Sequence, residues 1–199
     1  MKIAIEGQVC AGKTTLCNNL INVYGESRIC VIPDYSDFAG GGKNLPNALP
    51  ETFDQQIEAL IFFASLEVAR FQQYLLDTEL CIIDRSVHTL LAHCNAIASH
   101  YDQDILHRGK ALLNEAREMV WPDLILYLDV PHQTIVKRNH GKFAEGSIFI
   151  KEDFNWKFRE YFIPKLKCNM STPLVVIDGA LVPNVVCMHA CKEIETALT

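Results

Sequence analysis

The sequence has no long apolar run and no secretion signal, and these absences exclude two classes of protein. The longest uninterrupted apolar segment, residues 59–64, has six residues, whereas a membrane-spanning helix needs about 20. The N-terminal segment, residues 1–7, becomes charged and glycine-containing too early for the apolar region of a signal peptide. We therefore expect a soluble, cytoplasmic protein with no membrane partner.

Basic clusters and paired cysteines are also missing. The chain has 18 Lys and Arg against 24 Asp and Glu, a net charge of −6, and no basic face of the kind that binds a nucleic acid polymer. A small anionic ligand held by a few cations is compatible with this charge. The eight cysteines include no C-x-x-C pair, which favours reduced, mostly buried thiols.

The 199 residues fit one domain, residues 1–199. Short apolar segments rich in β-branched residues predict strands at 2–6, 29–33, 80–84, 124–129 and 174–178. Longer segments between them predict helices that include 13–23, 51–77, 102–120 and 151–167. Strands that are apolar throughout are typical of a parallel sheet covered on both faces. The alternation therefore predicts an α/β fold, a doubly wound parallel sheet with helices on both faces.

A phosphate-binding loop follows the first predicted strand. Residues 7–14, G-Q-V-C-A-G-K-T, match G-x-x-x-x-G-K-[ST] between a strand and a helix. In such a loop the backbone N–H groups surround a phosphate and the helix N-terminus adds partial positive charge. Lys13 then reaches the β- and γ-phosphates, and the Thr14 hydroxyl binds Mg²⁺. The predicted ATP-binding residues here are Gly7, Gln8, Val9, Cys10, Ala11, Gly12, Lys13, Thr14 and Thr15.

Two other classes of P-loop protein are alternatives at this point. A GTP-dependent switch needs a guanine-reading N-K-x-D, which the sequence lacks. Residues 37–40 spell D-x-x-G, but they come about 23 residues after Thr14 and not at the end of the third strand, so we interpret them as coincidence. A nucleotide-binding regulator without turnover is the other alternative.

Charged residues end the predicted strands, at the edge where parallel sheets bind ligands. Phosphoryl transfer needs Mg²⁺, a carboxylate near the attacking group and cations on the migrating phosphoryl. We interpret Asp84 as a magnesium ligand, Arg85 as the cation and Asp34 as the group that takes the acceptor's proton. The structural alternatives are a helix N-cap for Asp84 and a turn for Asp34.

After the fourth predicted strand, a short helix leads into a basic, glycine-containing segment around 137–147. Arg138 and Lys142 in this segment are predicted to close over ATP as a lid, excluding water and adding positive charge. The alternative is a solvated basic helix end, which the helix dipole favours.

The motifs resemble those of two sister groups of P-loop kinases. The opening I-E-G-Q-V-C-A-G-K-T-T, residues 5–15, is similar to the I-E-G-N-I-x-A-G-K-S-T of deoxynucleoside kinases. Asp84-Arg85 resembles both their E-R-S-V and the D-R-Y of thymidylate kinases. Residues 122–130, P-D-L-I-L-Y-L-D-V, are closer to thymidylate kinases. Arg138 falls where both groups carry a lid arginine, and the resemblance extends from residue 2 to about 178.

This resemblance implies a five-stranded parallel sheet and an ATP- and Mg²⁺-dependent kinase, with Asp34, Arg85 and Lys13 catalytic and Thr14 and Asp84 at the metal. We expect transfer of the γ-phosphoryl to the 5′ hydroxyl of a (deoxy)nucleoside. The alternatives are a thymidylate-kinase-like nucleoside monophosphate kinase and a kinase with a non-nucleoside acceptor. The group also suggests a homodimer.

The departures from the family patterns concern the acceptor. The glutamine with which deoxynucleoside kinases read the base falls on Phe63, and their aspartate after E-R-S-V falls on Leu90. The R-E-P-G-G of thymidylate kinases, whose arginine meets the acceptor's phosphate, is absent, which argues for an uncharged acceptor. The predicted acceptor-binding residues are Asp34, Tyr35, Phe63, Glu67, Arg70 and Arg85, with a solvated pair as the alternative for Glu67 and Arg70.

Overall fold

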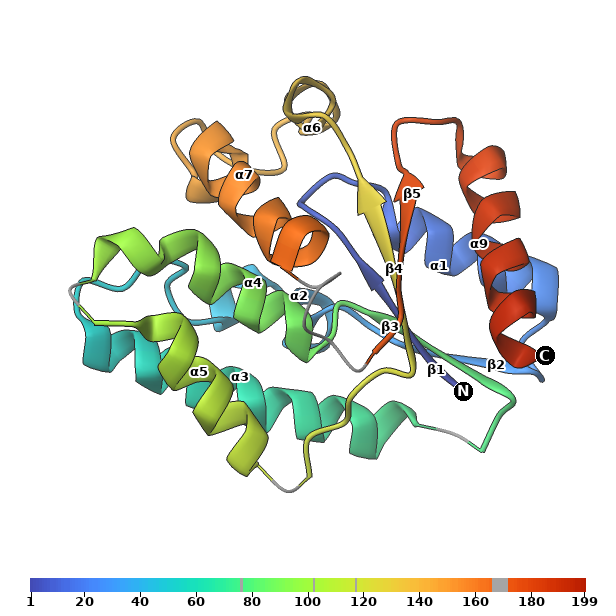
Figure 1. The fold of residues 1–199 in the computed structure, drawn as a ribbon, viewed down its shortest axis with the longest axis horizontal. Coiled ribbons are helices and arrows are strands. Elements are labelled where there is room, and N and C mark those ends of the chain that lie inside the picture. Colours follow the sequence, from blue (N-terminus) through green and yellow to red (C-terminus); the bar gives the residue numbers. More distant parts are fainter. Residues whose placement is uncertain (76, 102, 117, 166–171) are drawn as a thin grey trace.

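The computed structural model shows a five-stranded parallel sheet between layers of helices (Figure 1). It describes residues 1–199 except 76, 102, 117 and 166–171. The strands are adjacent in the order β2-β3-β1-β4-β5, and their bounds are β1 Lys2–Glu6, β2 Ile29–Ile32, β3 Leu80–Asp84, β4 Leu124–Asp129 and β5 Leu174–Asp178. The predicted fold and all five strands are confirmed; β2 ends one residue early, before Pro33.

Helices cover both faces of the sheet. One face carries α1 and α9, and the other carries α3, α4, α5 and α7. The bounds are α1 Lys13–Tyr24, α2 Tyr35–Phe38, α3 Phe53–Tyr74, α4 Val87–Ile97, α5 Ile105–Glu115, α6 His132–Arg138, α7 Glu152–Glu160 and α9 Pro183–Leu198. Shorter helical turns lie at Gly42–Asn44, Ala98–His100, Ile148–Ile150 and Tyr161–Lys165.

Three predicted helices are shorter in the structure than the sequence pattern suggested. The helix predicted over 51–77 begins at Phe53, because Thr52 and Gln55 form a capping box, and it ends at Tyr74. The helix predicted over 102–120 is α5. The helix predicted over 151–167 is α7 followed by a π-helical turn, and its last two positions lie outside the described residues.

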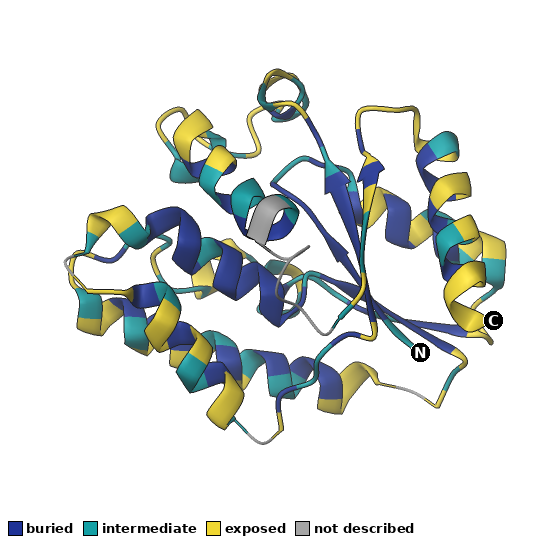
Figure 2. Ribbon diagram, in the orientation of Figure 1, coloured by how far each residue is buried: buried dark blue, intermediate teal, exposed yellow. Residues whose placement is uncertain are grey.

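Alternation along each strand divides the core into two parts. Ile3 and Ile5 of β1 pack with α1 and α9, whereas Ala4 between them packs with α3, α4 and α7. This is the period of two that a strand dictates. Buried residues line both faces of the sheet (Figure 2), and the strand order places the carboxyl ends of β2, β3 and β1 side by side at one edge.

No helix in the described part of the chain is long and apolar enough to cross a membrane. Among the described cysteines, five are buried and two, Cys10 and Cys191, are partly buried, and all are free thiols. Cys168 lies outside the described residues.

Candidate active site

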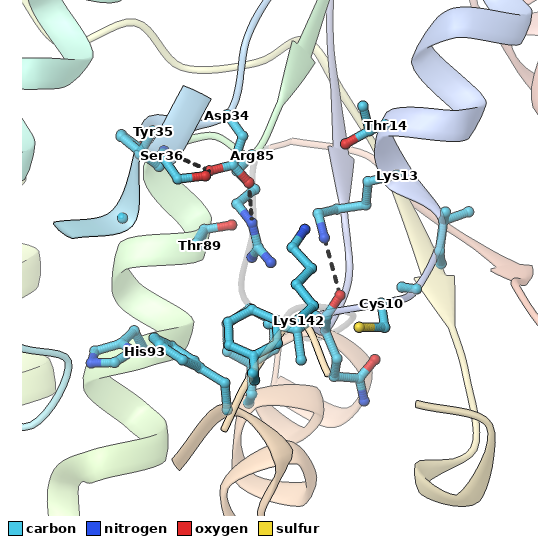
Figure 3. Close-up of a pocket in the computed structure, with 18 of the residues that line it drawn as sticks. Cys10, Lys13, Thr14, Asp34, Tyr35, Ser36, Arg85, Thr89, His93 and Lys142 are labelled. Atoms are coloured by element: carbon cyan, nitrogen blue, oxygen red, sulfur yellow. Dashed lines mark hydrogen bonds and ion pairs between the residues drawn. The ribbon is translucent and has the colours of Figure 1, made fainter. Parts of the chain in front are cut away.

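A cavity of about 970 Å³ opens at the carboxyl ends of the strands. Its volume is at the upper end of the range usual for small-molecule sites, about 300–1,000 Å³. The P-loop forms one end, and side chains of α3, α4 and α7 form the other. Figure 3 shows the cavity with Lys13, Asp34, Arg85 and Lys142 directed into it. The space is large enough for two substrates to meet.

The P-loop has the curled backbone that phosphate binding requires. Gly7 has a φ of 145°, and a Cβ there would lie 2.8 Å from the carbonyl oxygen of Leu128. Gly12, with a φ of 100°, precedes the first residue of α1, and Cys10 is also left-handed, with a φ of 57°. Residues 8–15 all line the cavity, whereas Gly7, also predicted to bind ATP, is not part of the lining. Only glycine fits at Gly7 without displacing β4.

Lys13 is buried and its Nζ donates a hydrogen bond to the Gln8 carbonyl oxygen at 3.0 Å. Burial, together with the nearby charge of Arg85, lowers the pKa of Lys13 to about 8. The ammonium is therefore charged near neutrality but loses its proton as the pH rises through 8. A phosphate bound against it restores the charged form, because an opposite charge stabilises the ammonium.

This predicts a pH dependence of nucleotide binding. Above pH 8 the affinity for Mg·ATP is expected to fall by about tenfold per pH unit, because binding must reprotonate Lys13. Calorimetric titration with Mg·ATP between about pH 6.5 and 9.5 measures this directly. An affinity that stays constant up to pH 9.5 would contradict the assignment of this lysine to the phosphates.

Thr14 and Asp84 form the candidate magnesium site. The Thr14 hydroxyl donates to Oδ2 of Asp84 at 2.7 Å, and Oδ1 of Asp84 is buried with no hydrogen-bond partner among the described residues. Burial raises the pKa of Asp84, while the charge of Lys13 opposes that rise. A buried, unpartnered carboxylate oxygen beside a hydroxyl fits Mg²⁺, which prefers hard oxygen ligands and keeps several waters.

Asp34 and Arg85 form an ion pair between the ends of β2 and β3. The Arg85 Nε donates to Asp34 Oδ2 at 2.7 Å, and the backbone N–H of Ser36 donates to Oδ1 at 2.9 Å. Burial acts to raise the pKa of Asp34, but the charges of Arg85 and Lys13 outweigh it and hold the pKa below its usual value. Asp34 also caps α2, so the turn predicted as an alternative coexists with a cavity-lining carboxylate.

Glu67 and Arg70, predicted to bind the acceptor, do not line the cavity, and their burial rules out the alternative of a solvated pair. Both side chains are completely buried and paired with one another on α3. The Arg70 guanidinium also donates to the carbonyl oxygens of Pro33, Asp84 and Arg85. Arg70 thus ties the end of β2 to the end of β3, and these two ends carry the Asp34–Arg85 pair.

Removing the Glu67 carboxylate is expected to destabilise the fold. Glu67→Leu leaves the Arg70 charge buried without its ion-pair partner, which costs about 3–5 kcal/mol of unfolding free energy. Urea unfolding measures this loss against Glu58→Leu, which removes an exposed carboxylate from the same helix. A loss below about 1 kcal/mol, the usual value of an exposed pair, would contradict the buried role.

The predicted lid residues lie beside the P-loop. Arg138, at the end of α6, donates to the carbonyl oxygens of Ala11 at 3.3 Å and Gly179 at 2.9 Å. The Lys142 side chain extends into the cavity on the side of Lys13 and Arg85 (Figure 3). Both residues line the same cavity as the P-loop, and their contact with ATP stays a prediction.

The end of the cavity opposite the P-loop contains polar residues that were not predicted from the sequence. Tyr35 and Phe63 line it as predicted. Further polar residues that line the cavity and were not predicted include Ser36, Lys43, Asn47, Gln56, Thr89, His93 and Asn155. Lys43 directly follows the glycine run 40–42, and Gln56 precedes Phe63 by seven residues, two turns along one face of α3. Those two spacings are the signals that could have identified them.

Three features define a phosphotransferase of the P-loop kinase class: the P-loop, the Thr14–Asp84 pair, and the cations that line the cavity, among them Lys13, Arg85 and Arg138. The model of the thymidylate kinase family matches residues 5–181. The chain therefore belongs to this family of nucleoside and nucleotide kinases. A comparison with curated proteins finds no match.

Solved structures show the same fold. A deoxyadenosine kinase from M. mycoides, with dCMP and a flexible dCDP bound, superposes with a TM-score of 0.72 at 17% identity and covers 98% of this chain and 100% of its own. A thymidylate kinase from Candida albicans superposes with a TM-score of 0.71 at 22% identity, covering 98% of this chain and 91% of its own. The expected similarity to both kinase groups is confirmed.

Proposed function

We propose that the protein transfers the γ-phosphoryl of Mg·ATP to a nucleoside monophosphate. The observation that carries this is the charge of the cavity. Among the described residues that line it, the cationic side chains are Lys13, Lys43, Arg85, Arg138 and Lys142, and the one acidic side chain is Asp34. This excess of positive charge suits two phosphate-bearing substrates, since a phosphate monoester alone carries about −1.5 to −2.

Lys43 is a cation that can take the place of the arginine of R-E-P-G-G, which meets the acceptor's phosphate in thymidylate kinases and is absent from this sequence. It lies in the turn Gly42–Asn44, beyond α2, at the acceptor side of the cavity. Its side chain is exposed and makes no ion pair with any described residue. The match to the thymidylate kinase family, whose acceptors are monophosphates, supports the same conclusion.

In the proposed reaction, an oxygen of the acceptor's phosphate attacks the γ-phosphorus, and the bond from that phosphorus to the β–γ bridging oxygen breaks. Lys13 and the P-loop N–H groups hold the β- and γ-phosphates, and Mg²⁺ beside Thr14 and Asp84 supplies charge neutralisation. Arg85, held by Asp34, faces the transferring group and stabilises its charge. ADP and a nucleoside diphosphate leave.

A nucleoside kinase is the second candidate, because Asp34 is a cavity-lining carboxylate suited to deprotonating a hydroxyl. The experiment that separates the two candidates is ADP release from Mg·ATP, measured on a panel of nucleosides beside their 5′-monophosphates. Turnover on monophosphates supports the proposal. Turnover on nucleosides alone would replace it with the second candidate.

The Asp34→Asn variant also distinguishes a nucleoside monophosphate kinase from a nucleoside kinase. A phosphate acceptor is already ionised and needs no general base, so kcat is expected to fall by at most about tenfold, short of the 10²–10⁴-fold that loss of a base costs. Steady-state kinetics on the best acceptor measure this, with Asp37→Asn, an exposed neighbour, as the control. A loss of about 1,000-fold on a nucleoside, with at most about tenfold on a monophosphate, would identify Asp34 as a base acting on a hydroxyl, since a misplaced Arg85 would lower both rates.

A further inference from the structure

Glu6, the last residue of β1, is a buried carboxylate that has no part in the phosphate and acceptor contacts described above. Its side chain is 0% exposed and does not line the cavity. Oε1 accepts hydrogen bonds from the backbone N–H of Ser86 at 2.9 Å and from the Ser86 hydroxyl at 2.7 Å. Oε2 accepts from the Thr89 hydroxyl. These bonds satisfy a group that is costly to bury, and they bind the start of α4 to the end of β1.

Arg85, immediately before Ser86, has a backbone conformation that is unusual for an arginine. Its φ of 69° lies in the left-handed region, where a residue other than glycine is strained. Because β3 ends at Asp84 and Ser86 caps α4, the chain passes from strand to helix through this one residue. Its guanidinium extends into the cavity (Figure 3) and donates to Asp34 at 2.7 Å and to the Gly7 carbonyl oxygen at 3.5 Å.

Hydrogen bonds hold the backbone on both sides of Arg85. The N–H of Arg85 donates to the carbonyl oxygen of Ile5 at 3.2 Å. The peptide bond that follows Arg85 is held at both of its polar atoms. Its carbonyl oxygen accepts from Arg70 at 2.8 Å, and its N–H, which belongs to Ser86, donates to Glu6. A strained backbone persists where its surroundings over-determine it, and two buried, charged side chains do so here.

The position of Glu6 in the chain ties this turn to the P-loop. In a capping box, the N–H of the N-cap residue donates to a Glu or Gln three residues later. The residue three after Ser86 is Thr89, and its hydroxyl donates to Glu6. The acceptor for the Ser86 N–H therefore comes from β1, one residue before Gly7. Glu6 thus links the peptide next to Arg85 to the strand that carries the phosphate-binding backbone.

We propose that Glu6 is a positioning residue for phosphoryl transfer, which holds Arg85 in its left-handed conformation at a fixed place relative to the P-loop. The proposal rests on the proposed function in that Arg85 meets the transferring phosphoryl. Without the Glu6 carboxylate, the backbone at Arg85 can relax to a negative φ, which moves the guanidinium away from the migrating group. A misplacement of about 1 Å is enough to lower a rate by about 100-fold.

Glu6→Gln tests this, because it keeps the shape of the side chain and removes the charge and one acceptor oxygen. Urea unfolding first establishes that the variant is folded in the assay. We expect kcat on the best acceptor to fall by about 10- to 100-fold, with KM for ATP within about threefold of wild type. The control for lost stability is Ile194→Val, which trims a fully buried side chain on the opposite face of the sheet and should leave kcat within about twofold. An unchanged kcat in a folded Glu6→Gln protein would overturn the proposal.

A double-variant cycle shows whether Glu6 acts through Arg85. If it does, adding Glu6→Gln to Arg85→Ala should lower kcat by no more than about twofold further. A merely structural role would lower kcat by the same factor in both backgrounds, and that result would overturn the proposal. So would an Arg85→Ala protein with the kcat of wild type.

Ser86→Ala replaces Glu6→Gln in both arms of the cycle if the latter fails to fold. It removes the hydroxyl hydrogen bond to Glu6 and keeps the backbone one. Its expected effect is a loss of about tenfold in kcat that disappears in the Arg85→Ala background. No loss in either background, or an equal loss in both, contradicts the role of Glu6.

The choice of acceptor separates this inference from the proposed function. If nucleosides react and monophosphates do not, the proposed function is wrong, and the same cycle on the reacting nucleoside still decides the role of Glu6. If monophosphates react and Glu6→Gln keeps the kcat of wild type, the function stands and the inference falls.

If neither acceptor reacts, nitrogen-15 NMR of the arginine Nε–H groups decides, with the Arg85 signal assigned by its loss in Arg85→Ala. We expect that hydrogen to exchange with water at least about tenfold faster in Glu6→Gln than in the wild-type protein, because the side chain is no longer held in place. An unchanged exchange rate would overturn the inference.

Discussion

Lys13→Ala is expected to lower kcat/KM for ATP by about 1,000-fold or more. Lys13 Nζ is the buried cation nearest the curled P-loop backbone, hydrogen bonded to the Gln8 carbonyl oxygen at 3.0 Å. In a site shielded from water, loss of one such charge costs at least the 10²–10³-fold that loss of a single preorganised donor costs. Because Lys13 holds the nucleotide before and during transfer, both ATP affinity and kcat should fall.

The control is Lys137→Ala, which removes an exposed positive charge from α6 and should leave both constants within about twofold, as expected for a screened surface charge. The measurement is steady-state ADP release with varied ATP, beside calorimetric ATP binding. A Lys13→Ala protein that binds and turns over Mg·ATP within about tenfold of wild type would show that the phosphates lie elsewhere.

Arg85→Ala is expected to lower kcat by about 10³–10⁵-fold with a smaller effect on KM, the range found for a cation that meets the transferring phosphoryl. The side chain follows β3, has a left-handed backbone with a φ of 69°, and is oriented by its ion pair with Asp34 at 2.7 Å. Its interaction with the migrating group strengthens as charge develops, so the loss should fall on kcat.

Two further variants test whether Arg85 acts through its planar guanidinium and whether the effect is limited to this arginine. Arg85→Lys keeps the charge but loses the planar guanidinium that bridges two oxygens, so it should recover only part of the activity. Arg108→Ala removes an exposed arginine from α5 and should have no effect on kcat. An Arg85→Ala protein with unchanged kcat and a raised KM for the acceptor would make Arg85 a ground-state binding residue instead.

The elements that the sequence predicted correctly are those whose signal is local. The five strands are continuous apolar segments, and the P-loop is a contiguous motif whose glycines have backbone conformations that other residues rarely adopt. Asp34 and Arg85 each closely follow a predicted strand, and the ends of adjacent parallel strands necessarily meet. Their ion pair is therefore a consequence of the strand order β2-β3.

The features that the sequence did not predict depend on packing between distant segments. Glu67 and Arg70 have the i, i+3 spacing of an ordinary helix-surface pair, and only the position of α3 against β2 and β3 shows that they are buried. Gln56, on α3, and Asn155, on α7, come together at one cavity although 99 residues separate them. No local pattern distinguishes such amides from solvated ones.

Transfer of phosphoryl from ATP to a nucleoside monophosphate can be tested in one competition experiment. The protein is mixed with Mg·ATP, the four deoxynucleosides and their 5′-monophosphates at equal concentrations, and the nucleosides, monophosphates and diphosphates are separated and quantified by liquid chromatography. We predict that deoxynucleoside diphosphates form at the expense of the monophosphates, with no consumption of nucleosides. Consumption of a nucleoside with an equal gain in its monophosphate, and no deoxynucleoside diphosphate formed, would contradict the proposal and make Asp34 the base of a nucleoside kinase.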